Sequence, residues 1–189
     1  MKNPYAIGKR CYLRVPEEGD VDSNWYEWFS DPTVTKYLTD HFWPNTKEEQ
    51  LRFVRRLVGD KNRLVLLVCS LDSVSPIGVV SLGQINFAHR YASFSFVVPP
   101  SLNGSAQITF EASKLLLDAA FFKMNLLNIR TFTASENMAS IQMQKLLGFK
   151  VVGEFSEMYL IEGSPNNEIC MQLKIEDWRT ANNPLLRSR

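Results

Sequence analysis

The sequence predicts a mixed α+β fold, and three observations lead to this class. The chain has 189 residues, 45% of them hydrophobic, which suits one compact domain with a substantial core. Three strand-like segments follow one another with short connections over residues 63–98, as in an antiparallel meander. Helix, strand, helix and two strands follow over residues 108–175. We therefore expect a single domain over residues 1–189, with a core at about 11–177 and a loose tail at 181–189.

The front of the chain predicts one short strand followed by helices. Cys11–Val15 is strand-like, and the segment from about Asp20 to Ser30 carries aromatic residues at helical spacing up to a proline. We expect a second short helix over Thr33–Leu38. Thr46 and Glu49 have the spacing of a capping box, which predicts that another helix begins there.

The remaining elements alternate between apolar strands and amphipathic helices. In chain order they are strands at 63–70, 77–87 and 91–98, a helix from Ile108 to about Met124, a strand at 128–135, a helix at 138–147, and strands at 149–161 and 168–175. Gly148 is expected to end the helix before it in the left-handed conformation.

Charge and cysteine content exclude several classes of partner. The net charge is +1, whereas proteins that bind the phosphate backbone of a nucleic acid usually carry a strong basic excess. We therefore expect no nucleic-acid partner. No apolar stretch is long enough for a membrane span, so we expect no membrane partner either. Three scattered cysteines argue against a disulfide framework and favour the reducing cytoplasm, and no Cys/His cluster has metal-ligand spacing, so no metal is expected.

A basic cluster lies on the helix that begins after Thr46. Arg52, Arg55 and Arg56 follow two glutamates on this segment. We interpret the cluster as a solvated helix face, with anion binding as the alternative.

The segment PPSLNGSA connects a strand to the long helix. Gly104, Ser105 and Ala106 are small, and small residues let backbone N–H groups approach an anion closely. The following helix offers unpaired N–H groups and the positive end of its dipole. The segment alone allows two interpretations, a pyrophosphate-binding loop or an ordinary connection.

A second motif follows the next strand directly. It consists of an Asn at the end of a strand, a helix, and a Gly-Phe pair that starts a further strand. The residues that define it are Asn137, Ser140, Gly148 and Phe149. With PIGVVSLGQIN, YASFSFVVPPSLNGSA and the helix and strand after them, this order resembles the Gcn5-related N-acetyltransferase (GNAT) superfamily. The resemblance covers residues 11–177. It implies a mixed central sheet with splayed central strands and flanking helices.

The front of the chain narrows the resemblance to one branch. WYEWFSDPTVTKYL and PNTKEEQLRFVRRL resemble the branch that contains ribosomal-protein N-terminal acetyltransferases and amino-sugar acetyltransferases. The resemblance implies acetyl-CoA as the acyl donor and direct transfer of the acetyl group to a primary amine, without a covalent enzyme intermediate.

The resemblance also implies which residues bind acetyl-CoA. The strand end would contact the pantetheine arm and supply a backbone donor to the oxyanion, the loop would hold the pyrophosphate through its backbone, and the Asn motif would complete the site. These residues are Phe96, Val97 and Val98 on the strand, Asn103, Gly104, Ser105, Ala106, Gln107 and Ile108 in the loop, and Asn137 and Ser140. The loop lacks the leading Arg or Gln of the family pattern, and a second register would put Gln107 and Thr109 at the glycine positions.

The sequence alone does not identify the general base or the general acid. Many relatives have a Glu near the start of the third meander strand, and Ser93 stands at the matching position. His89, His41 and Glu111 are the other candidates for the base, and a water relayed by a serine is a further one. The alternative for each histidine is an ordinary loop residue, and the alternative for Glu111 is a partner of the helix dipole. The Tyr that often serves as the acid is replaced by Gln144, and Tyr159 is a remote alternative.

Aromatic residues near the front helices are the candidates for the acceptor pocket. The candidates are Trp25, Trp28, Phe42 and Trp43. Packing in the core is the favoured alternative for Trp25 and Trp28, whereas stacking on the acceptor and packing both stay open for Phe42 and Trp43. We expect an N-acetyltransferase for a small-molecule amine, such as an amino sugar or a nucleotide-linked amino sugar. A protein N-terminal acetyltransferase and a non-catalytic binding module of the same fold are the alternatives. Dimers are common among similar proteins, so a homodimer is also considered.

Overall fold

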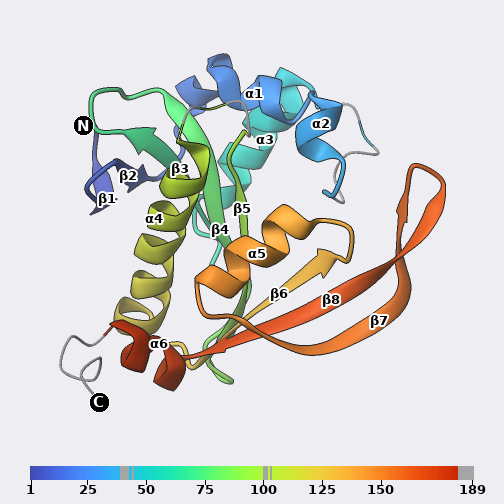
Figure 1. Cartoon of the computed structure of the whole chain (residues 1–189). Coiled ribbons are helices and arrows are strands. Elements are labelled where there is room, and N and C mark those ends of the chain that lie inside the picture. The colour runs from blue at the N-terminus through green and yellow to red at the C-terminus, as the bar shows by residue number, and fades with distance from the viewer. Residues whose placement is uncertain (39–42, 44, 100–101, 103, 183–189) are drawn as a thin grey trace. The chain divides into compact units, whose positions relative to one another are not determined.

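The computed structural model describes residues 1–38, 43, 45–99, 102 and 104–182. Its elements are β1 (Pro4–Ile7), β2 (Cys11–Arg14), the 3-10 helix η1 (Glu18–Asp22), α1 (Asn24–Trp28), α2 (Pro32–Thr35), α3 (Lys47–Leu57), β3 (Leu64–Ser70), β4 (Pro76–Asn86), β5 (Tyr91–Val97), α4 (Ser105–Asp118), the π-helical turn η3 (Ala119–Lys123), β6 (Asn128–Ala134), α5 (Met138–Leu146), β7 (Lys150–Ile161), β8 (Ser164–Lys174) and α6 (Ile175–Asn182) (Figure 1). The strands follow the order β1-β2-β3-β4-β5-β6-β8-β7 in one mixed sheet, so the predicted α+β class is confirmed.

Several boundaries differ from the sequence prediction; for example, the helix predicted over Thr33–Leu38 is α2 at Pro32–Thr35. The helix predicted over residues 20–30 is divided into η1 and α1, because Ser23 has an extended backbone and its side chain caps α1 by accepting from the N–H of Trp25. α4 begins at Ser105 rather than at 108, and β8 begins at Ser164 rather than at 168. The tail predicted to be loose from residue 181 starts inside α6, which the sequence prediction missed together with β1.

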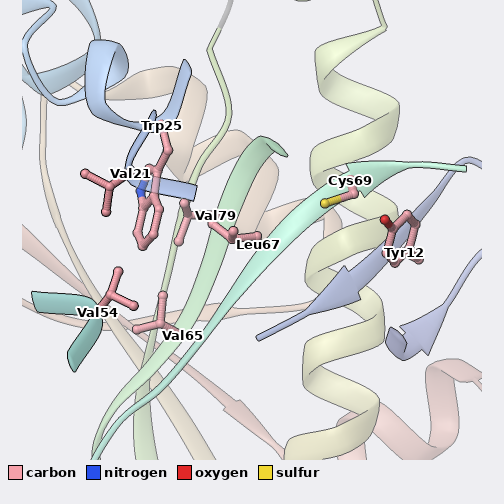
Figure 2. Packing of buried hydrophobic residues seen from close by; sticks show 8 residues of the cluster. All are labelled: Tyr12, Val21, Trp25, Val54, Val65, Leu67, Cys69 and Val79. Carbon is pink, nitrogen blue, oxygen red and sulfur yellow. The ribbon is translucent and has the colours of Figure 1, made fainter. Parts of the chain in front are cut away.

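The chain divides into two compact units, and the first comprises residues 1–83 and 95–117. Its hydrophobic cluster joins side chains of β2, η1, α1, α3, β3 and β4 (Figure 2); they are Tyr12, Val21, Trp25, Val54, Val65, Leu67, Cys69 and Val79. Each fully buried aliphatic or aromatic side chain of this kind contributes about 1.5–3 kcal/mol to stability. Trp25 is 1% exposed, so the expectation that it belongs to the core is confirmed.

The second unit comprises residues 84–94 and 118–189. In it, β6 pairs antiparallel with β8 and β8 with β7, and the turn between β7 and β8 has two residues with positive φ, Glu162 and Gly163. Phe94 stacks on Phe149 with ring centroids 5.9 Å apart, and Phe149, the aromatic residue of the predicted Gly-Phe pair, is buried. α6 is held by Trp178, whose Nε1–H donates to Asp118 at 2.9 Å. Among the described residues, no helix is long and apolar enough to cross a bilayer.

Candidate functional site

The parallel pairing of β5 with β6 stops partway along both strands. It joins Tyr91, Ala92 and Ser93 to Asn128, Ile129 and Arg130, although β5 continues to Val97 and β6 to Ala134. The resemblance predicted splayed central strands, and the early end of this ladder agrees with that expectation. Ser93 is half-buried and lies in the last pair, at the point where the pairing stops.

Ser93 and His89, two of the candidates for the general base, lie in the second unit. Beside Ser93, the Arg130 guanidinium lies over the Tyr91 ring at 4.6 Å and donates to Gln84 at 2.9 Å. His89 lies in the exposed turn before β5, where its backbone N–H donates to Asn86 at 2.7 Å. Within the described residues, no hydrogen bond joins the His89 and Ser93 side chains. His41, the third candidate, lies outside the described residues.

The predicted pantetheine segment lies beside a glycine of β4 in the first unit. A Cβ on Gly78 would meet Cγ2 of Val98 at 2.6 Å and the carbonyl oxygen of Val97 at 3.0 Å. The two chain segments therefore approach each other more closely than any residue with a side chain allows. Ser95 on β5 and Ser81 on β4 share a hydrogen bond of 2.7 Å. Phe96, Val97 and Val98 are half-buried.

The predicted pyrophosphate loop is largely the first turn of α4. Gly104 has φ +72, a conformation that favours glycine, and Ser105 to Ile108 are helical. The prediction of a loop over these residues is thus wrong, but the first turn of a helix still presents backbone N–H groups without partners in the helix. Asn103 lies outside the described residues.

Glu111 joins α4 to the turn between β1 and β2. Its carboxylate accepts hydrogen bonds from the backbone N–H groups of Lys9 and Arg10. This structural role accounts for the acidic side chain in the second turn of the helix.

The Asn motif is built as a helix start with a buried polar network. Asn137 caps α5, because its Oδ1 accepts from the N–H of Ser140 at 3.2 Å. Gln144 is 3% exposed; it accepts from the Thr131 hydroxyl at 2.6 Å and donates to Thr133 and to the Ser140 hydroxyl, both at 2.9 Å. Gln144 therefore holds α5 against β6 and fixes the side chain of Ser140.

We expect Gln144→Leu to lower the free energy of unfolding by about 2–3 kcal/mol, because the buried hydroxyls of Thr131 and Thr133 and the half-buried hydroxyl of Ser140 lose their partner. Urea unfolding followed by circular dichroism measures the loss. Gln142→Leu, an exposed position on the same helix, is the matched control and should change stability by less than about 0.5 kcal/mol. Equal stability of the two variants would contradict the assigned role of the network.

Other groups that carry acid–base or nucleophilic chemistry are buried. Burial and the nearby Glu168 carboxylate raise the pKa of Tyr159 to about 12, so this phenol stays protonated at neutral pH. Burial also raises the pKa of the Cys11 thiol to about 12, and it raises the pKa values of Cys69 and Cys170. All three cysteines are free. In the described part of the chain, no group of three His, Cys, Asp or Glu side chains is placed to hold a metal ion.

A cavity of about 710 Å³ lies among α1, α2 and α3 in the first unit. Trp25 and Phe53 line it, and Trp43, 81% exposed, lines it as well. Trp43 thus lies beside a cavity, whereas Trp28 packs against the hydrophobic cluster, which is the favoured alternative for this residue, and does not line the cavity. Phe42 lies outside the described residues.

Gln50 and Arg63 also line this cavity, and the sequence reasoning named neither of them as a candidate. Arg52 and Arg55 of the basic cluster do form ion pairs on the solvated face, with Glu48 at 2.8 Å and Glu18 at 2.9 Å. Arg56 differs from both because it lines the cavity. The helical geometry could have shown this difference, because consecutive residues of an α-helix are rotated by about 100°, which places Arg56 on a different side of the helix from Arg55.

Comparison with known proteins places the chain in a family. A family model described as an acetyltransferase (GNAT) domain matches residues 10–150. Spermidine N(1)-acetyltransferase of Escherichia coli (strain K12) is 35% identical over 94 residues, 50% of this chain and 50% of that protein. The uncharacterized N-acetyltransferase YnaD of Bacillus subtilis (strain 168) is 28% identical over 149 residues, 79% of this chain and 84% of that protein. The chain spans about half the length of the first of these relatives.

A solved structure agrees with the fold. The crystal structure of spermidine N-acetyltransferase from Vibrio cholerae in complex with CoA and spermine aligns with a TM-score of 0.81 and 22% identity, over 90% of this chain and 99% of that one. At this identity the likeness concerns the fold. The family match over residues 10–150, together with the Asn motif and the interrupted β5–β6 pairing, shows that this chain belongs to the acetyltransferase (GNAT) domain family.

Proposed function

We propose that the protein transfers the acetyl group of acetyl-CoA directly to a primary amine of a small molecule. The observation that carries the proposal is the early end of the β5–β6 pairing at Ser93 and Arg130 in a chain of the GNAT family. Two further features support the proposal. Gly78 lets β4 approach the backbone of Val97 and Val98 closely, and Ser105 to Ile108 form the first turn of α4, so the backbone of both predicted acetyl-CoA-binding segments has a fixed conformation.

The proposed chemistry needs a neutral amine and a donor to the developing oxyanion. A backbone N–H of Phe96, Val97 or Val98 is proposed as that donor. An α-amine with a pKa near 8 needs little help to lose its proton, so Ser93 acting through a water, or His89, suffices as the base. The buried thiols take no part, which fits direct transfer.

The first test is a thermal-shift titration with acetyl-CoA, with free adenine nucleotides as controls. Ligand at one hundred times its dissociation constant stabilises the folded state by about 2.7 kcal/mol, which is several degrees for a protein of this size. A shift with acetyl-CoA that the nucleotides do not match supports the proposal. The absence of any shift at millimolar acetyl-CoA would overturn it and favour the non-catalytic binding module.

The acceptor classes can be separated by thiol release with acetyl-CoA. We propose a small amine, such as an amino sugar or a nucleotide-linked amino sugar, and the E. coli relative is named for a small amine too. A protein N-terminus is the second candidate. Faster release with peptides than with any small amine would favour that alternative.

We also propose that the protein self-associates through β7 and works in the cytoplasm. β7 is the last strand of the sheet order and exposes five large apolar side chains: Val151, Val152, Phe155, Met158 and Leu160. Large apolar side chains that are exposed on an edge strand favour association with another chain. Free, buried cysteines fit a reducing compartment.

We expect Phe155→Asp with Met158→Asp to convert a homodimer or larger assembly into monomers, because two charges would be buried at the interface. Light scattering after size-exclusion chromatography measures the mass. Phe122→Asp, which changes a side chain of similar exposure on η3, should leave the mass unchanged. A monomeric wild-type protein would contradict the proposal.

A further inference from the structure

One lining residue of the cavity among α1, α2 and α3 has a buried polar atom without a partner. Trp25 is 1% exposed, and its indole N–H donates to no group in the described structure. Gln50, which is 6% exposed, adds a carboxamide to the lining of the same cavity. Unpaired buried donors are costly, so native proteins satisfy them with a ligand or water. An unpaired indole N–H on a residue that lines a cavity therefore indicates a binding site.

The charge of the lining favours an anion. Arg56 and Arg63 line the cavity, and neither forms an ion pair within the described residues. Glu49 is the one carboxylate among the described lining residues, and it is already paired with Arg52 at 2.5 Å. Arg63 is held over the Phe53 ring, with 5.9 Å between the guanidinium carbon and the ring centroid. Two guanidinium groups that lie beside apolar rings and have no ion pair among the described residues suit a carboxylate or phosphate on an organic molecule.

We infer that this cavity binds the non-reacting end of the acceptor, and that the acceptor is an amine that also carries a phosphate or a carboxylate. The inference rests on the proposed acetyl transfer. A volume of about 710 Å³ lies within the range of small-molecule sites. A polyamine, the substrate class in the name of the E. coli relative, would meet two cations here and no unpaired carboxylate among the described lining residues.

Matched pairs of probes test the charge requirement without turnover. Glucosamine 6-phosphate is compared with glucosamine, phenylalanine with phenylalaninamide, and spermidine is titrated alone. The reporter is the indole N–H resonance of Trp25 in the ¹⁵N-labelled wild-type protein. We expect it to shift with the member of a pair that carries the phosphate or carboxylate at a dissociation constant about tenfold lower than with the member that lacks this group, since charge-assisted hydrogen bonds to arginine are the stronger ones.

Two variants tie that preference to the cavity. Arg56→Gln with Arg63→Gln should abolish the difference between the members of a pair, whereas Arg55→Gln, the same change one residue away and outside the cavity, should keep it. No shift of the Trp25 resonance with any probe, equal binding within both pairs, or tighter binding of spermidine would overturn the inference.

Acetyl transfer to the same probes completes the test. We expect thiol release with acetyl-CoA to be about tenfold more efficient, in kcat/KM, for the member that carries the phosphate or carboxylate than for the member that lacks it. Binding of the anion without transfer, in a protein that acetylates another amine, would show that the cavity does not serve the acceptor. If acetyl-CoA itself fails to bind, the proposed function fails while the resonance shift still reports on the cavity, so the two failures are distinguishable.

Discussion

Arg14→Met is expected to lower the free energy of unfolding by about 3–5 kcal/mol, because it leaves a buried carboxylate without its partner. The Arg14 guanidinium donates to both carboxylate oxygens of Asp20, at 2.7 and 2.5 Å, and also to the carbonyl of Val74 at 2.9 Å. The two side chains are 4% and 10% exposed. Urea unfolding monitored by circular dichroism measures the change.

Loss of the Arg14–Asp20 ion pair should disturb the cavity among α1, α2 and α3 as well as lower the global stability. Asp20 lies in η1 and accepts from the backbone N–H of Glu17 at 2.7 Å, and its carbonyl accepts from the Ser23 hydroxyl at 2.6 Å. Ser23 in turn caps the helix that carries Trp25. The ion pair therefore fixes the start of α1 and with it one wall of the proposed acceptor site.

An exposed ion pair in the same unit provides the control. The Lys2 Nζ and Glu17 Oε2 atoms are 2.6 Å apart, but the two side chains are 55% and 46% exposed. Lys2→Met should change stability by less than about 1 kcal/mol, because solvent screens exposed pairs. A similar small effect from Arg14→Met would show that the Asp20 carboxylate regains solvent in the variant, and it would contradict the anchoring role.

Hydrophobic periodicity predicted most elements because it reports directly on burial. β3, β4, β5, β6 and α5 lie within a residue or two of their predicted ranges, and Thr46 and Gly148 cap their helices as expected. The missed elements have other causes. β1 has four residues and is too short for a pattern, and Ser23 divides a helical pattern through a side-chain hydrogen bond rather than through hydrophobicity.

The candidate site was less predictable because it depends on contacts between distant segments. Gln144 stands where many relatives have a tyrosine, and only the hydrogen bonds to β6 show that it is a structural residue. Arg55 and Arg56 are neighbours in one basic cluster, yet one pairs with Glu18 and the other lines a cavity. No local pattern separates such residues, since the difference lies in what each meets in space.

Gly78→Ala should weaken acetyl-CoA binding by about tenfold, which corresponds to about 1.4 kcal/mol. The added Cβ would meet Val98 Cγ2 at 2.6 Å and the Val97 carbonyl oxygen at 3.0 Å. Valine is stiff about χ1, and the second contact is to backbone, so the strain is relieved by a shift of the segment proposed to bind the pantetheine arm. Overpacking of this kind also costs about 1–3 kcal/mol of stability. Calorimetric titration with acetyl-CoA measures the affinity.

Two further variants separate displacement of this segment from a general effect of losing a strand glycine. Gly153→Ala, on β7, places its Cβ where nothing lies within 4 Å, so affinity should not change. Adding Val98→Ala to Gly78→Ala removes the closest contact and should restore part of the affinity, with the remainder set by the Val97 carbonyl. If Gly78→Ala binds acetyl-CoA as the wild type does, the close approach of β4 does not position the cofactor segment. If all three variants lose affinity equally, the effect arises from the strands and not from the contact.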